Sequence, residues 1–180
     1  LRGVARASLG EPAALDAATL LGLVQVRRPD AADLLHLQGA WATVRWLVER
    51  GATVVLDAQA QRFWHGADVL DWPAARPFAL STDVNMVVEG EPTSARAVVH
   101  TRGLRKFGRP DLVVLDVPGP RWDAVAGLVR TLAARLVDGA LWNAGEVVTA
   151  GTEAVRLSAW RPDTGTDLHL DNEAFRLEAA

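Results

Sequence analysis

One stretch of the chain, residues 100–112, gathers the side chains best suited to chemistry. It reads HTRGLRKFGRPDL and contains one histidine and four cations, together with two glycines: His100, Arg102, Arg105, Lys106 and Arg109, with Gly103 and Gly108. Glycines can bend a loop so that guanidinium and ammonium groups converge on a phosphate or a carboxylate. The five basic residues are therefore candidate anion- or ligand-binding residues, and the two glycines are expected to shape the loop.

Two other interpretations of this stretch stay open. Gly103 and Gly108 have the spacing of a phosphate-binding loop, but Arg109-Pro110 stands where that loop requires Lys-Ser/Thr, so it is not a P-loop. The stretch could instead be a solvated basic turn with Phe107 tucked into the core. His100 could act as a general acid or base, or it could simply form a hydrogen bond at the end of a strand.

Other catalytic and metal-binding patterns are sparse. The sequence has no Cys, which excludes disulfides, thiolate zinc sites and a cysteine nucleophile, and it has no GxSxG elbow. Asp167, His169 and Asp171 alternate, so on a strand they would share one face and could hold a divalent metal. We assign no catalytic residue, metal site or cofactor, and whether the chain is an enzyme stays open, with a non-enzyme favoured.

Tryptophan is abundant, with seven residues in the chain of 180. Trp41 falls on a predicted core stripe, whereas Trp46, Trp64 and Trp72 do not. Because exposed tryptophans commonly anchor protein interfaces, these three are candidate partner-surface residues.

Composition limits the classes of partner. A net charge of −3 gives no general attraction to nucleic acid or to anionic membranes, and no apolar run approaches the length of about 20 residues that spans a bilayer. We therefore expect a protein partner, no nucleic acid and no membrane, and the lack of thiols fits a cytoplasmic protein. The chain begins at Leu1 rather than Met, which leaves room for an upstream leader or domain.

Hydrophobic periodicity predicts the elements that would hold the 100–112 stretch in place. The clearest helix covers residues 34–48, with Leu34, Leu37, Trp41, Val44 and Val48 on one face, and a second covers about 123–136. Strands are expected at 4–9, 23–26, 53–57, 85–88, 95–101 and 112–117, followed by a hairpin of 147–149 with 154–160. A helix is expected at 13–21, an extension of the 53–57 strand at 61–64, and a surface connection at 66–83.

These elements predict an α+β fold with an antiparallel or mixed sheet and two main amphipathic helices. The chain is expected to form one domain over residues 1–180. A helix, a Gly-Ala pair and a strand recur, which fits a pseudo-repeat of 1–90 and 91–160 in the form of two ferredoxin-like halves, followed by a polar tail at 161–180.

Residues 100–112 resemble a stretch of an uncharacterised bacterial domain family, with the pattern His-Thr-x-Gly-(Leu/Met)-x-x-Phe-Gly-x-Pro-(Asp/Glu)-Leu between strands. The upstream helix with Trp41 and the strand ending at Asp57 also match, although Val113 stands where many members have an acidic residue. Similar domains occur near toxin-immunity and stress loci, and the family supplies no catalytic residues. The resemblance implies a non-enzymatic protein-interaction domain of the immunity type; the alternative is a small-molecule or anion-binding domain, which could be enzymatic, with its site at 100–111.

Overall fold

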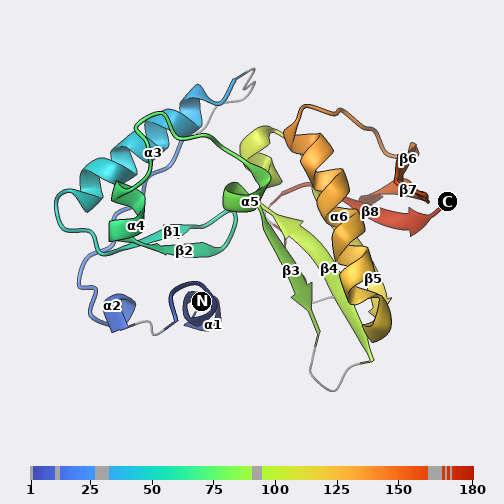
Figure 1. Cartoon of the computed structure of the whole chain (residues 1–180), viewed down its shortest axis with the longest axis horizontal. Coiled ribbons are helices and arrows are strands. Elements are labelled where there is room, and N and C mark those ends of the chain that lie inside the picture. The colour runs from blue at the N-terminus through green and yellow to red at the C-terminus, as the bar shows by residue number, and fades with distance from the viewer. Residues whose placement is uncertain are drawn as a thin grey trace. The chain divides into compact units, whose positions relative to one another are not determined.

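The computed structural model describes residues 2–10, 13–26, 33–90, 95–161, 168, 170 and 172–180. Contacts between residues divide the chain into two compact units, which we call the N-terminal unit (residues 1–78) and the C-terminal unit (residues 79–180). Figure 1 shows the elements of both units, and each unit is described by itself.

The N-terminal unit joins short helices to a two-stranded hairpin. Its elements are α1 (Arg2–Leu9), α2 (Ala13–Asp16), α3 (Leu35–Val48), β1 (Val54–Asp57), β2 (Arg62–His65) and α4 (Gly66–Leu70). Strands β1 and β2 pair antiparallel, with Val54 opposite His65. The stripe predicted on α3 is confirmed, because Leu37 and Val48 are buried on it. Gly51 follows the helix at φ +103°, a conformation that glycine adopts without strain.

Several expected elements of the N-terminal unit are wrong. Residues 4–9 are helical rather than a strand; this segment consists largely of Ala, Arg and Leu, which favour helix. The helix expected at 13–21 ends at Asp16, and residues 23–26 form no strand. Residues 61–64 do not extend β1 but turn back as its partner β2. The surface connection expected at 66–83 contains α4 and a further short helix.

The C-terminal unit is built on a six-stranded mixed sheet. Its elements are α5 (Leu80–Asp83), β3 (Asn85–Glu89), β4 (Arg96–Arg102), η1 (Leu104–Phe107), β5 (Asp111–Pro118), η2 (Gly119–Arg121), α6 (Trp122–Val137), β6 (Val147–Ala150), β7 (Glu153–Trp160) and β8 (Ala174–Ala179). The strand order is β3-β4-β5-β8-β7-β6, and among the described strand pairs only β5–β8 is parallel. Among the described strands, β3 pairs with β4 alone and is therefore an edge strand.

Helix α6 covers one face of this sheet. It runs across strands β4 and β5 (Figure 1), and its residues Val129, Leu132 and Ala133 are fully buried. On another part of the unit, Val113 of β5 packs with Leu168 and Ala174. Since α6 has apolar residues on one side and Arg130 and Arg135 exposed on the other, its sequence alone selects the buried face.

The structure confirms the α+β class, and it confirms the strands predicted near 85–88, 95–101 and 112–117, the second helix and the closing hairpin. The expectation of two ferredoxin-like halves is not confirmed, since the described sheets have two strands and six strands. The polar tail expected at 161–180 instead contains β8, a central strand. No helix in the described ranges is long and apolar enough to cross a membrane.

Candidate functional site

The 100–112 stretch forms the end of β4, a 3-10 turn and the start of β5. Gly103 and Gly108 flank η1 with φ values of 107° and 65°, so both lie in the left-handed region that glycine tolerates. Between them Leu104 is fully buried and Phe107 is nearly so. The expected role of the two glycines in shaping the loop fits these backbone angles.

A buried hydrogen-bond network closes the loop at its base. The Thr101 hydroxyl donates to Asp111 Oδ1 at 2.8 Å and accepts from the Leu112 backbone N–H at 2.9 Å. The Leu104 N–H reaches the same carboxylate oxygen at 3.3 Å. Thr101 and Asp111 are almost completely buried, so the network supplies partners for polar groups that water cannot reach.

Residues that precede β8 join this network from the far end of the chain. The Asn172 side-chain amide donates to Asp111 Oδ2 at 2.8 Å and to the Arg109 carbonyl at 2.9 Å. The Asp111 N–H donates to the Glu173 carbonyl at 2.8 Å. Asp111 thus joins the loop, the start of β5 and the residues that precede β8.

The cations of the stretch do not converge on one point. The Lys106 ammonium is buried and lies 3.9 Å from Asp83 Oδ1. Asp83 is fully buried and also accepts the Thr82 hydroxyl and the Ala79 N–H. Lys106 therefore faces a carboxylate of its own chain, which competes with any external anion.

His100 and Arg102 lie next to a different carboxylate. The His100 side chain is fully buried, with Nε2 3.2 Å from Glu89 Oε1 and Nδ1 3.3 Å from the Thr101 carbonyl oxygen. The Arg102 guanidinium lies 3.8 Å from the same Glu89 oxygen. Burial lowers the pKa of His100 below its usual 6.5, although Glu89 acts in the opposite direction. At neutral pH this environment favours the uncharged ring of His100.

Arg105 and Arg109 complete the set of basic residues. Arg105 is exposed and lines an open groove of about 560 Å³ together with Leu170, Asn172 and Glu173. Arg109 is partly buried and donates to the Gly108 carbonyl at 3.2 Å. Of the five predicted ligand-binding residues, Arg105 alone lines this groove, and the anion-binding role of the set stays a prediction.

No metal site is found among the described residues, since no three His, Asp or Glu side chains gather there. Asp167, His169 and Asp171, the candidate metal ligands, lie outside the described residues.

Sequence reasoning missed the acidic partners Asp83 and Glu89. Each stands at the end of a short element in an ordinary context. Only the pairing of β3 with β4 and the position of α5 bring them to the cations. For Asp111 the sequence offers a weak indication of a structural role, because this residue lies directly after Pro110 and before an apolar run.

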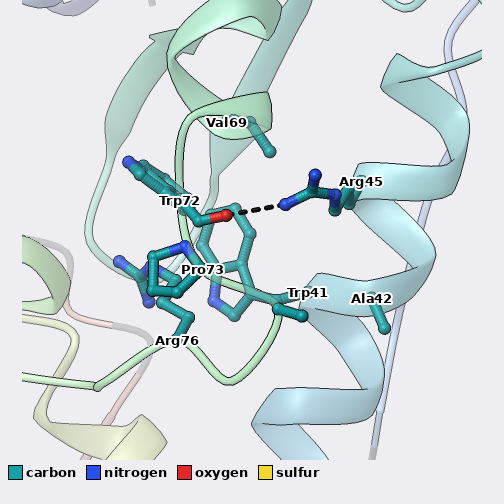
Figure 2. Close-up of a pocket in the computed structure, with 8 residues that line it drawn as sticks. Trp41, Ala42, Arg45, Val69, Trp72, Pro73 and Arg76 are labelled. Atoms are coloured by element: carbon teal, nitrogen blue, oxygen red, sulfur yellow. Dashed lines mark hydrogen bonds between the residues drawn. The ribbon is translucent and has the colours of Figure 1, made fainter.

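The tryptophans of the N-terminal unit fall into two groups. Trp72 packs edge-on against Trp41 and Trp64, with ring centroids 4.9 and 5.0 Å away, so Trp64 and Trp72 belong to an aromatic cluster rather than to an open surface. Figure 2 shows Trp41 and Trp72 beside Arg76 and Pro73, with Arg45 donating to the Trp72 carbonyl at 2.6 Å. The cavity that these residues line has a volume of about 20 Å³, room for roughly one water molecule.

Arg76 is the residue of this cluster that sequence reasoning missed. It is buried, and its guanidinium carbon lies 4.6, 4.3 and 4.9 Å from the ring centroids of Trp41, Trp72 and Phe78. Such a cation–π contact contributes about 2 kcal/mol when the cation is desolvated. Arg76 therefore has a packing role inside the N-terminal unit.

Trp46 differs from the other two candidates. It is 49% exposed on α3, and the Arg50 guanidinium lies 3.9 Å from its ring centroid. Residues 19–26 carry the most exposed large apolar side chains among the residues that the structure describes. Leu20, Leu21 and Leu23 are 93%, 96% and 83% exposed. This surface was also missed, because the sequence predicted a helix and a strand there.

Comparison of the chain with protein-family models, with curated proteins and with solved structures gives no match. The resemblance of residues 100–112 to an uncharacterised bacterial family therefore stays a prediction, and function has to be argued from the geometry.

Proposed function

We propose that this chain is a cytoplasmic, non-enzymatic protein-interaction domain of the immunity type, and that its N-terminal unit binds the partner. The observation that carries the proposal is the segment of residues 19–26. Three leucines within four residues are each more than 80% exposed there. Burying one such side chain on a partner would contribute about 1.5–3 kcal/mol.

The backbone of this segment is also available for pairing. Residues 19–26 form neither helix nor strand, and within the described ranges their backbone makes no hydrogen bond. Unpaired N–H and C=O groups beside apolar side chains are a template for an added strand. The partner expected here is therefore a protein that supplies a strand with apolar side chains.

Helix α3 adds an aromatic anchor to this surface. A Cβ placed on Gly22 would lie 3.8 Å from Leu47 Cδ1, so the segment runs beside the part of α3 that carries Trp46. Trp and Arg are the residue types most often found at binding hot spots, and Trp46 is stacked with Arg50.

The proposal is tested with the double variant Leu21→Asp/Leu23→Asp. Because both side chains are exposed, we expect the free energy of unfolding to change by no more than about 0.5 kcal/mol. A photo-crosslinking amino acid at position 20 should give one discrete protein adduct in cells, and the double variant should abolish that adduct.

Leu141→Asp is the matched control, because Leu141 is 75% exposed in the other unit. It should leave the adduct at position 20 unchanged, and a crosslinker at position 141 should not give the same adduct. If the double variant unfolds the protein, or if the adduct persists in it, the leucines do not form the binding surface.

A further inference from the structure

The buried histidine of the 100–112 stretch belongs to the C-terminal unit, whereas the proposed partner surface belongs to the N-terminal unit. His100 lies on β4 directly opposite Val87 of β3, and Glu89 of β3 reaches its Nε2. Strand β3 is an edge strand of five residues, held to the sheet through β4. The environment of His100 therefore depends on whether β3 stays paired.

Both ring nitrogens of His100 face oxygen acceptors. Nδ1 lies 3.3 Å from the Thr101 carbonyl oxygen, and Nε2 lies 3.2 Å from a Glu89 carboxylate oxygen without hydrogen-bond geometry. A neutral imidazole has one N–H and can serve only one of these acceptors. The charged imidazolium could serve both, but it would have to be buried without water.

Two charged groups act on the ring, Glu89 from β3 and Arg102 from β4 itself. On the β5 side its strand neighbour is the apolar Val113. Glu89 is about half exposed and already lies near Arg102, so it is only a partial counter-charge for a second cation. Desolvation is the larger influence and favours the neutral ring.

We propose that His100 makes the pairing of β3 with β4 sensitive to pH, so that acidification releases the β3 edge. Separation of β3 would let water reach the ring and would allow it to take up a proton that the closed sheet resists. The open form would then expose the hydrogen-bonding edge of β4, a surface suited to strand addition.

The direction follows from linkage. The closed state has a His100 pKa below 6.5, whereas the opened strand returns it towards 6.5. Between these two values the open state binds more protons, so closure weakens as the pH falls, by at most about tenfold per pH unit. Below the closed-state pKa the effect levels off.

Hydrogen–deuterium exchange of the intact chain tests this inference. Protection of the β3 amides, corrected for intrinsic exchange rates, should be several-fold lower at pH 5.5 than at pH 7.5, while protection in α6 should change less. His100→Gln keeps a side-chain donor but cannot become charged, so its β3 protection should be the same at both pH values. An equal loss of β3 protection in this variant, or no loss in the wild type, would overturn the inference.

A second measurement uses the wild-type chain, so it does not depend on whether a variant folds. The NMR titration of the His100 ring in the wild-type chain should have its midpoint below 6.5. A midpoint at or above 6.5 would mean that the closed sheet accepts the charged ring, and the inference would then be wrong.

Discussion

At the scale of single residues, Thr101, Lys106 and Asp111 of the 100–112 stretch are buried and make their polar contacts within the protein. The Asp111 carboxylate accepts hydrogen bonds from the Thr101 hydroxyl, the Leu104 N–H and the Asn172 amide. Lys106 lies against Asp83. A hydrogen bond to a charged group contributes more to stability than one between neutral groups, which gives the Asp111 carboxylate a structural role.

The Thr101 hydroxyl is the most sensitive point of this network. Replacing it with Val removes one hydrogen bond to a carboxylate and leaves the buried Leu112 N–H without its partner. We expect Thr101→Val to lower the free energy of unfolding by about 3 kcal/mol. Thr101→Ser keeps the hydroxyl and loses only a methyl group, so it should cost about 1 kcal/mol. Urea unfolding of the two variants measures the difference, and equal losses would show that the hydroxyl is unimportant.

At the scale of elements, the turn between β4 and β5 depends on backbone conformation more than on charge. Gly103 and Gly108 adopt left-handed backbone conformations, which allows η1 and its flanking turns to connect β4 to β5 within eight residues, 103–110. The basic side chains therefore have different surroundings: Lys106 lies near Asp83, His100 and Arg102 lie near Glu89, and Arg105 lines the groove. A loop rich in cations is therefore not by itself an anion site.

Gly108 gives a direct measure of this backbone requirement. A Cβ there would meet no atom within 4 Å, so Gly108→Ala tests conformation alone. At φ +65° we expect a loss of about 1 kcal/mol in the free energy of unfolding. Gly119→Ala is the control, because that position is equally open and has no positive φ; it should change stability by no more than about 0.5 kcal/mol. Similar values for the two variants, measured by thermal or urea unfolding, would argue against a conformational role for Gly108.

At the scale of the whole molecule, the charges are divided unevenly between the two units. Residues 1–78 contain 8 basic and 8 acidic residues, whereas residues 79–180 contain 11 and 14. The unit that carries the basic stretch is thus the acidic one. Strong binding to nucleic acid normally rests on several phosphate contacts by unpaired cations.

We therefore expect the intact chain to bind neither single-stranded nor double-stranded nucleic acid at physiological salt. Fluorescence anisotropy with labelled oligonucleotides checks this, and lowering the salt to 50 mM should add at most weak binding. Affinity that falls steeply with salt and depends on Arg105 would contradict the expectation. It would indicate that the groove beside Arg105 binds nucleic acid.

The sequence by itself determined the elements with a long, regular pattern. Helices α3 and α6 and strands β3 to β5 were predictable because their apolar residues repeat with the period of the element. It also located the turn at 103–110 through its glycines and Pro110. Short segments were predicted poorly, as at residues 4–9 and 13–26, because a few residues satisfy more than one pattern.

Only the tertiary structure decided what the chemical side chains contact. Glu89 meets His100 because β3 and β4 pair in one register, and Asn172 meets Asp111 because β8 inserts beside β5. Likewise, Leu20, Leu21 and Leu23 are exposed because helix α2 ends at Asp16 and does not include them. These contacts join residues far apart in sequence, and a local pattern carries no information about which distant segment will pack against it.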